Sequence, residues 1–393
     1  MAAHVVIGIL YNIARRASFL ARFGLDIIPN SALKKNHLAI IGALALGPFL
    51  LRCAKDDPAL PSPKPCVVDS TSSTVYVAGT ETKPDATGRS ANYAVYWKNG
   101  HEIMLTDGLS NAHAYGIAVS ATDVYVVGVV ERIATCWKNG VPESLSESIS
   151  VARAVAISGS DVYVGGNVLE EGHILAVYWK NGNPVMLSDT LNESQATSIA
   201  VAGNDVYVSG NIILNGHSVA KYWKNGESVN LSDTAKVDAT TSSLFVSGTD
   251  IYVAGQEIIH RSTTPARIAT YWKNGTPVLL SNGIHDTSAL SIAVTGNGVA
   301  VVGYERYNDI SNSIAVYWTN GYELTVSGNT GKYISYAMAT SIFATGDNVY
   351  VAVQETDQVK NSSIAKYWRD GCSINLNNGT TSTIDLNSIF VIK

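Results

Sequence analysis

Four glutamates recur at one position of a repeated segment, where they could together provide an acidic binding site. Each stands two residues after a short apolar stretch of the VYVAG type, and they are Glu81, Glu257, Glu305 and Glu355. If the repeats surround a common axis, the four carboxylates would form an arc suited to a cation or a basic peptide. The alternative is that each is an ordinary solvated residue at the start of a loop.

A second set of candidate residues stands where the chain enters the first strand of each repeat. His113, Tyr115, Arg153, Gln195 and Asp385 occupy these connections, which are expected to surround the mouth of a central channel. A tyrosine ring can stack on a sugar, and a guanidinium can bind a carboxylate through two parallel hydrogen bonds. Tyr115 and Arg153 are therefore candidate ligand-binding residues, with ordinary rim residues as the alternative.

Motifs of established enzyme chemistry are missing from the sequence. It contains no Gly-x-Ser-x-Gly elbow, Walker loop, His-Glu-x-x-His, Cys-x-x-Cys or EF-hand loop. His173, His217 and His260 fall in loops at irregular offsets, which does not favour a metal site. We therefore assign no catalytic residue, no metal and no cofactor, and we favour a binding protein over an enzyme.

The elements that position these residues follow from a repeat in which every tryptophan takes part. The seven copies are AVYWKNG, ATCWKNG, AVYWKNG, AKYWKNG, ATYWKNG, AVYWTNG and AKYWRDG, centred on Trp97, Trp137, Trp179, Trp223, Trp272, Trp318 and Trp368. A VYVAG-type segment precedes each copy. Repeats of about 40–50 residues indicate a solenoid or a propeller.

Each repeat divides into four short strands. The VYV and AVYW segments combine β-branched and aromatic residues, and Asn-Gly is the dipeptide preferred by two-residue hairpin turns. Four antiparallel strands repeated seven times predict an all-β protein, a seven-bladed β-propeller of four-stranded blades. The tryptophans, placed identically in every third strand, are expected to pack between neighbouring blades rather than to bind sugars.

The two ends of the chain compete for one strand of the first blade. Residues 66–68 precede the first VYVAG segment, and residues 388–391 follow the last repeat. We expect the more apolar C-terminal strand to take this place, so that the N- and C-terminal segments pair and close the ring. Cys136 replaces the tyrosine of its repeat and is expected to be a buried thiol. A bridge between Cys66 and Cys372, in the first and last blades, is an open alternative.

The first 65 residues differ from the repeats. Lys34 and Lys35 precede an apolar run of about 15 residues at positions 37–51, which is the form of a secretory signal and is short for a bilayer span. Residues 1–52 are accordingly interpreted as a leader, of which residues 1–32 belong to a misassigned start or to an amphipathic membrane-surface helix. Residues 53–65 form an acidic, proline-rich tether, and residues 66–393 form the propeller.

Two resemblances follow from these motifs. Leu50-Leu51-Arg52-Cys53 resembles a bacterial lipobox, in which Cys53 would be lipidated, and Lys55-Asp56-Asp57 resembles the surface-export tag of Bacteroidota lipoproteins. Arg52 departs from the lipobox, where a small residue is usual. The YWKNG repeats resemble those of bacterial β-propeller repeat proteins over residues 66–393. The resemblances imply an extracytoplasmic lipoprotein, at the outer membrane or cell surface, held to the membrane through Cys53.

Composition limits the class of partner. Lys and Arg total 27 against 32 Asp and Glu, a net charge of −5, which argues against a nucleic-acid partner. We expect a surface-exposed or periplasmic binding module whose long loops on one face receive a glycan, a peptide or an envelope protein. The alternative is a propeller-type hydrolase or lyase that acts on a glycan or lactone at the channel mouth.

Overall fold

The computed structural model describes residues 73–232, 238–260, 265–307, 313–326, 334–357, 362–369, 372–377 and 382–393. The leader, the tether and Cys53 lie outside these residues, and so do residues 66–68. The part of the chain that the structure describes contains no helix of the length and apolarity that a bilayer crossing requires. It consists of β-strands joined by turns and loops.

The strands of the described residues form antiparallel sheets in which neighbours along the chain are neighbours in space. Five sheets have four strands and a sixth has eight. The first four-stranded sheet has the order β28-β1-β2-β3, with β28 (Thr383–Ile392), β1 (Thr74–Pro84), β2 (Ser90–Lys98) and β3 (His101–Met104). The second comprises β4 (Ala112–Val119), β5 (Val124–Val130), β6 (Ile133–Lys138) and β7 (Val141–Ser144).

Three further four-stranded sheets repeat this pattern. They comprise β8 (Ser150–Ser158), β9 (Asp161–Glu170), β10 (His173–Lys180) and β11 (Asn183–Met186); β12 (Ser194–Ala202), β13 (Asp205–Leu214), β14 (His217–Lys224) and β15 (Glu227–Asn230); and β16 (Asp238–Ser247), β17 (Asp250–His260), β18 (Pro265–Lys273) and β19 (Thr276–Leu279).

The eight-stranded sheet consists of two four-stranded runs. They are β20 (Asp286–Thr295), β21 (Gly298–Arg306), β22 (Ser313–Thr319) and β23 (Tyr322–Thr325), followed by β24 (Ile334–Thr345), β25 (Asn348–Asp357), β26 (Ser362–Arg369) and β27 (Cys372–Asn375). Within the described residues, one parallel strand pair, Ser313 with Tyr336, links the two runs in the sheet.

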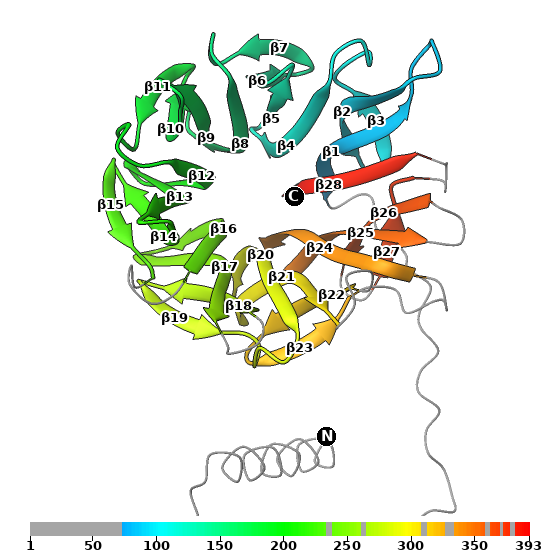
Figure 1. Ribbon diagram of the computed structural model, residues 1–393. Coiled ribbons are helices and arrows are strands. Elements are labelled where there is room, and N and C mark those ends of the chain that lie inside the picture. Colours follow the sequence, from blue (N-terminus) through cyan, green and yellow to red (C-terminus); the bar gives the residue numbers. More distant parts are fainter. Residues whose placement is uncertain are drawn as a thin grey trace, which may run out of the picture. The chain divides into compact units, whose positions relative to one another are not determined.

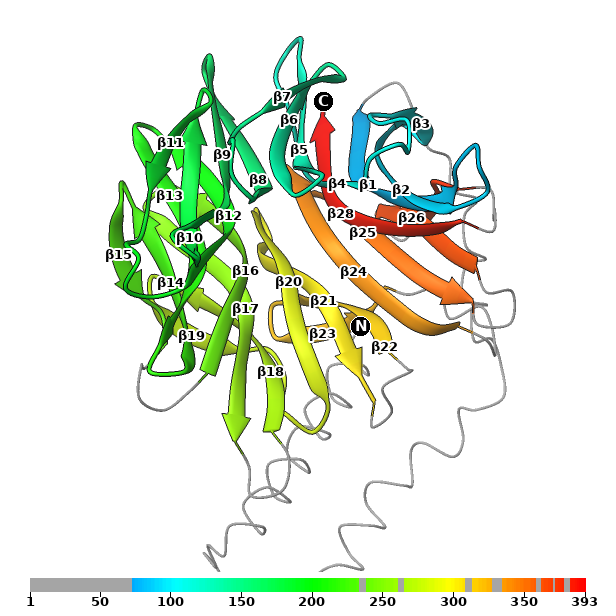
Figure 2. The ribbon, with the colours of Figure 1, turned by 45° about the horizontal axis from the view of Figure 1, so that its top comes forward.

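The sheets stand around a central axis like the sectors of a wheel (Figure 1). The first strand of each run, namely β4, β8, β12, β16, β20 and β24, lies innermost together with β28, and the short fourth strands lie outermost. Figure 2 shows the innermost strands β16, β20, β24 and β28 crossing the ring from one face toward the other. The starts of these strands therefore gather at one face and their ends at the opposite face.

The Asn-Gly turns join the third strand to the fourth, as expected. Asn99 and Gly100 both have positive φ angles, 50° and 82°, which the two-residue turn requires. The Asn99 side chain also accepts a hydrogen bond of 2.8 Å from the backbone N–H of Val75. The same bond recurs at Asn139, Asn181, Asn225 and Asn274. The motif thus fixes the turn and fastens it to the neighbouring strand.

The lysine of the repeat also has a structural role. Lys180 lies 2.8 Å from Asp161 at the start of β9, and equivalent pairs form at Lys138, Lys224 and Lys273. Hydrogen bonds from Lys180 and Asn181 lower the pKa of the Asp161 carboxyl. The recurring polar residues of the repeat therefore belong to the fold rather than to a binding site.

The tryptophans pack between sheets, which confirms their expected structural role. Trp97, Trp137, Trp179, Trp223, Trp272 and Trp318 are buried, and Trp368 is half-buried. Trp97 shares an apolar cluster with Tyr350 and Tyr367, which belong to the neighbouring run of strands. Each sheet thus buries its apolar face against the next one.

The C-terminal strand takes the innermost place beside β1. Residues 383–392 pair antiparallel with residues 74–82, and Val75 faces Val391. Of the two segments considered for this position, the C-terminal one occupies it. Cys136 is a free, buried thiol, as expected, and burial raises its pKa to about 12. Cys372 is disulfide-bonded.

Candidate functional site

The innermost strands share an irregularity that the sequence analysis did not anticipate. Each of the seven has a β-bulge, at which the pairing with the second strand skips one residue. A bulge redirects the side chain of the extra residue and is frequent beside binding sites. The skipped residues are Tyr115, Arg153, Thr197, Ser242, Leu290, Thr340 and Asn387.

These seven residues meet around the axis. All of them line one pocket of about 170 Å³, which we call the channel mouth. Thr340 and Thr197 supply hydroxyl groups, and Asn387 supplies an amide. Among the described residues of this lining, Arg153 carries the charge. Seven bulges in register therefore produce a polar ring at the end of the axis where the innermost strands begin.

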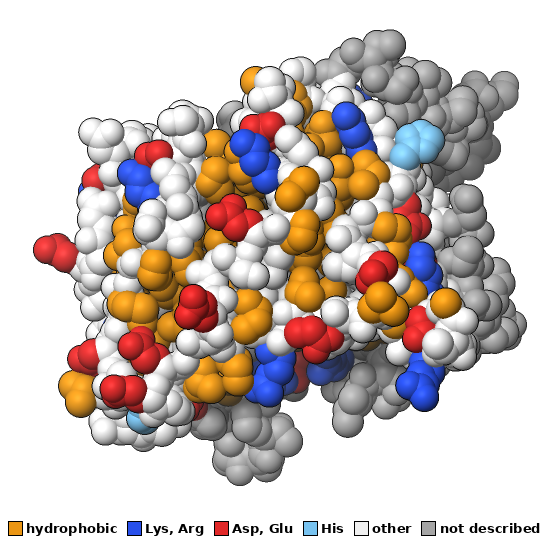
Figure 3. Space-filling model, turned by 90° about the horizontal axis from the view of Figure 1, so that it is seen from above, with side chains coloured by type: hydrophobic (Ala, Val, Ile, Leu, Met, Phe, Trp, Pro, Cys, Tyr) orange, Lys and Arg blue, Asp and Glu red, His pale blue; other side chains and the backbone are white. Residues whose placement is uncertain are grey.

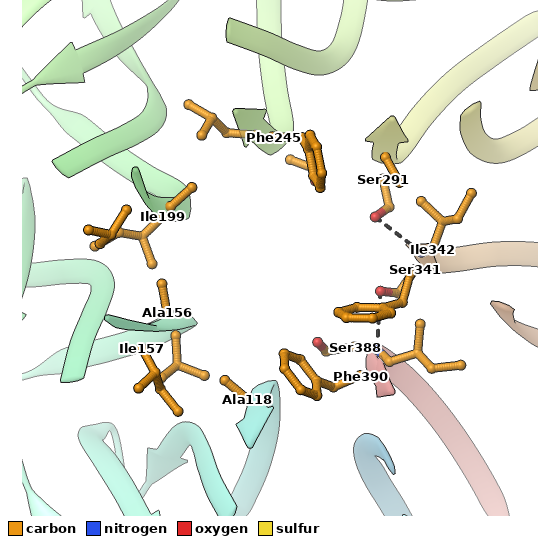
Figure 4. A pocket seen from close by; sticks show the side chains of 18 of the residues that line it. Ala118, Ala156, Ile157, Ile199, Phe245, Ser291, Ser341, Ile342, Ser388 and Phe390 are labelled. Carbon is orange, nitrogen blue, oxygen red and sulfur yellow. Dashed lines mark hydrogen bonds between the residues drawn. The ribbon is translucent and has the colours of Figure 1, made fainter. Parts of the chain in front are cut away.

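A second ring lies one residue further along the same strands. Five of its seven positions are serines, namely Ser198, Ser243, Ser291, Ser341 and Ser388, and we call this set the serine ring. Ser291 Oγ accepts a 3.2 Å hydrogen bond from the backbone N–H of Ile342. Ser341 Oγ accepts an equivalent bond from Ile389 (Figure 4). These bonds join neighbouring innermost strands, so the serine ring both lines the channel and connects the sheets.

Aromatic and cationic groups stack at one side of the channel mouth. The Arg153 guanidinium lies 5.9 Å from the centre of the Tyr115 ring, within the range of a cation–π interaction. The Tyr115 ring is also parallel to the His113 ring, with 5.9 Å between the ring centres. Burial raises the pKa of Tyr115, and the positive charge of Arg153 opposes this effect. Both sequence-predicted residues of the mouth are therefore brought together.

A carboxyl group lies near this side of the mouth, although it is outside the lining. Asp385 stands two residues before Asn387 on β28, and loss of hydration to surrounding protein atoms raises its pKa, while His113 opposes this effect. Burial lowers the pKa of His113, although Asp385 acts in the opposite sense. The His113 Nδ1 atom lies 3.2 Å from Thr80 Oγ1. The guanidinium of the mouth thus has an imidazole and a carboxyl group beside it.

Tyr336 on β24 also belongs to this environment. Burial raises its pKa, with electrostatic contributions from Tyr304, Arg306 and Asp385. Sequence reasoning missed Tyr336 because the residues at its position in other repeats, such as Asp286 and Asp238, are of a different type. By contrast, Gln195 is exposed on β12, two residues before Thr197, as the sequence order implies.

The four recurring glutamates do not form an arc at the axis. They lie on second strands, and none of them is among the described residues that line the channel mouth. Glu81 pairs with Lys83 at 2.5 Å, and Glu355 pairs with Lys366 at 2.6 Å. The expectation of a shared acidic site is therefore wrong in its geometry.

The remaining two glutamates have distinct surroundings. Glu257 is half-buried, and this burial raises the pKa of its carboxyl. The pKa of Glu305 is raised first by burial and then by the nearby Glu323 carboxyl. Tyr307 donates a 3.2 Å hydrogen bond to Glu305, and the Trp318 indole N–H donates a 2.9 Å bond to Glu323. A carboxyl pair therefore exists, but it lies away from the channel.

Other sites for charged ligands are not evident. Within the described residues, no three His, Cys, Asp or Glu side chains are placed to hold a metal ion. On the face shown in Figure 3, acidic and basic side chains are scattered among apolar ones. The channel mouth is thus the place where several functional groups of different chemistry converge.

Comparison with known proteins identifies the fold. No protein-family model and no curated protein sequence matches the chain. Similar solved structures include the β-propeller domain of the Trilobed protease from Pyrococcus furiosus, with 11% identity, a TM-score of 0.50, and coverage of 78% of this chain and 93% of that one. The Pyrococcus horikoshii acylaminoacyl peptidase has 13% identity, a TM-score of 0.50, and coverage of 77% of this chain and 51% of that one.

TolB from Acinetobacter baumannii is also similar, with 11% identity, a TM-score of 0.41 and 64% coverage of both chains. The radial antiparallel sheets and the two structures with a TM-score of 0.50 define the protein as a β-propeller, which confirms the expected all-β propeller class. Identities this low establish the fold, whereas function depends on the residues of the site.

Proposed function

We propose that the protein is a seven-bladed β-propeller that serves as an extracytoplasmic binding module. The count of seven treats the eight-stranded sheet as two blades, because a single parallel strand pair, Ser313 with Tyr336, makes its two halves one sheet. The pairing of β28 with β1 supports closure of the ring by the C-terminal strand. Closure of this kind leaves only short protected edges.

The ligand is received at the channel mouth, on the face where the innermost strands begin. The observation that carries this proposal is the ring of seven bulged residues, which includes Tyr115 and Arg153. Such convergence of polar groups in a concave site is typical of ligand pockets. No regular strand pairing requires a bulge at this position in all seven innermost strands.

An acidic sugar fits the groups present. The Arg153 guanidinium provides a fork of donors for a carboxylate, and aromatic faces such as that of Tyr115 stack on sugar rings. Asp385 and Asn387 provide acceptors and donors for sugar hydroxyls. We therefore propose uronic-acid-containing glycans as the ligand class, among the glycans, peptides and envelope proteins considered from the sequence.

The recurring glutamates have no part in this site. Glu81 and Glu355 are engaged by lysines, so a ligand would have to displace an existing ion pair to reach them. Glu257 and Glu305 belong to different sheets. We assign ligand binding to Tyr115 and Arg153 and not to the four carboxylates.

The test is thermal stabilisation of the full chain by oligogalacturonate. We expect oligogalacturonate to raise the melting temperature and its neutral galactose counterpart to leave it unchanged, because Arg153 selects the carboxylate. Arg153→Ala should lose the response, whereas Arg132→Ala, which removes an exposed arginine that is not among the lining residues of the mouth, should keep it. An equal response of both variants would refute the proposal.

An enzymatic function is the second candidate. Asp385, His113 and Tyr115 place a carboxylate, an imidazole and a phenol at one mouth, which are the group types used for proton transfer. A glycan lyase or hydrolase would shorten the oligosaccharide during incubation. Chromatography of the glycan after the thermal-shift experiment separates this candidate from binding alone.

We also propose that the propeller is a lipoprotein of the outer membrane or cell surface. This proposal is supported only by the sequence around Cys53 and by the acidic tether that follows it. Metabolic labelling with palmitate should mark the wild-type chain and leave Cys53→Ala unlabelled. Labelling of both chains, or of neither, would contradict the anchor at Cys53.

A further inference from the structure

The axial channel has a second compartment on the far side of the serine ring. This compartment has a volume of about 780 Å³, and we call it the apolar chamber. Residues from the second halves of the innermost strands line it, including Ala118, Ala156, Ile157, Phe245 and Phe390 (Figure 4). The chamber opens toward the short turns that follow the innermost strands, on the face where the sequence analysis predicted no site.

The shape of the chamber is set by one position of the repeat. Three residues after each bulge, the innermost strands place Phe245, Phe343 and Phe390 on some sheets and alanine on the others, at Ala118, Ala156, Ala200 and Ala293. The rings of Phe343 and Phe390 are 4.7 Å apart and tilted by 51°. The Phe343 and Phe390 rings thus form one wall, and the small alanine side chains leave the adjoining space unfilled.

The chemistry of the lining limits what the chamber can hold. None of the described residues that line it carries a charge. Hydroxyl groups of Ser243, Ser291, Ser341 and Ser388 lie at its inner end, where it adjoins the channel mouth. Ser291 and Ser341 already accept backbone hydrogen bonds, which leaves their hydroxyl hydrogens to donate.

We propose that the apolar chamber binds an uncharged amphiphile, with its aliphatic or aromatic body against the phenylalanines and one oxygen on the serine ring. Pockets of this size with apolar walls and a few polar groups are typical of small-molecule sites. A charged ligand would lose its hydration with no opposite charge to replace it. This site is distinct from the channel mouth and does not depend on the acidic-sugar proposal.

The decisive variant fills the chamber with a side chain that the repeat already uses. Ala200→Phe places phenylalanine at the position that Phe245, Phe343 and Phe390 occupy in other sheets, so the fold has precedent for it. The control is Val278→Phe, which adds the same ring on the exposed outer strand β19. Ala156→Leu is a second variant at the same position of another sheet, for use if Ala200→Phe does not fold.

The probe is 1-decanol, and binding to the full chain is measured by titration calorimetry. We expect saturable binding with a negative heat-capacity change, which marks burial of apolar surface. Ala200→Phe should weaken binding at least tenfold, and Val278→Phe should leave it unchanged. Phe343→Ala enlarges the chamber and should shift the preference from decanol toward dodecanol.

Two results would overturn the proposal. One is absence of saturable binding by the wild-type chain, and the other is equal binding by Ala200→Phe and Val278→Phe, which would place the alcohol elsewhere on the chain. Oligogalacturonate is titrated in parallel, and Arg153→Ala is included. Absence of sugar binding by the wild-type chain, with decanol binding retained, would count against the mouth proposal alone, so the two proposals fail separately.

Discussion

Lys366 Nζ lies 2.6 Å from Glu355 Oε1, and the two side chains are only 7% and 2% exposed. They form an ion pair within a β-sheet, between the neighbouring strands β25 and β26. A buried pair of this kind is strongly coupled, because removing one partner leaves the other charge without compensation. Glu355 was expected to be one of four acidic ligand-binding residues, and this pairing gives it a structural role instead.

Removal of the Glu355 charge should destabilise the protein severely. Glu355→Gln leaves the Lys366 ammonium buried without a counter-charge, and we expect a loss of about 3–5 kcal/mol in the free energy of unfolding. The measurement is urea denaturation followed by tryptophan fluorescence. The double variant Glu355→Gln/Lys366→Met should recover most of the loss, and a double variant as unstable as the single one would contradict this account.

Lys221 should behave as a lysine that lacks such a partner. It occupies the place of Lys366 in another repeat and is 7% exposed, but Ile212 stands where Glu355 would be. Burial lowers the pKa of Lys221. Ile212→Glu should therefore raise this pKa and slow acetylation of Lys221 by acetic anhydride near pH 9, as quantified by mass spectrometry. The control Ile213→Glu changes the exposed neighbouring position and should leave the labelling rate as it is.

The Glu305–Glu323 carboxyl pair should make stability depend on pH. In the equivalent blade position, Lys83 lies within 3.5 Å of both Glu81 and Glu102, whereas Tyr307 replaces that lysine beside Glu305. The pKa of Glu305 is raised in the folded state. Its contribution to the free energy of unfolding is therefore fully present below the pKa of the unfolded chain, and it is lost as the pH rises through the pKa of the folded state.

Tyr307→Lys copies the arrangement around Lys83 and should relieve the repulsion. We expect the unfolding free energy at pH 7 to rise by about 0.5–1 kcal/mol and the gain to vanish near pH 4, where the carboxyls are protonated. Chemical denaturation at the two pH values gives the comparison. Leu109→Lys adds the same charge at an exposed site, and an equal gain there would attribute the effect to net charge.

The C-terminal strand should be indispensable. Deletion of residues 386–393 removes most of β28 and exposes β1, whose buried residues include Val75 and Val77. We expect the cooperative thermal transition to be lost or lowered by more than 10 °C, since several buried apolar side chains are removed together. Calorimetry provides the readout, with deletion of Lys393 alone as the control. An unchanged melting temperature after the longer deletion would mean that another segment takes this place.

The wrong expectation about the glutamates has a simple stereochemical cause. Glu81 stands four residues after Val77 on the same strand, and alternate residues of a strand share a face. Val77 packs with Trp97 between neighbouring sheets, so the Glu81 side chain points to that side as well. This periodicity was available in the sequence. β1 is also a second strand, one place removed from the axis, which likewise predicts that Glu81 does not face the channel.

Local and repeated features were determined by the sequence alone. The strands, the Asn-Gly turns and the buried tryptophans follow from residue types within a few positions of each other, and seven copies reinforce each assignment. Tyr115 and Arg153 were also placed correctly at the axis, because strand order decides which connections reach it.

The bulge ring, the ion pairs and the apolar chamber were decided by the tertiary structure. A bulge depends on the register between two strands, and the residue types of Tyr115 and Thr197 do not indicate that the pairing will skip them. The Glu355–Lys366 pair joins separate strands. The chamber is the space left between alanines and phenylalanines of different sheets, and this space exists only once the sheets surround one axis.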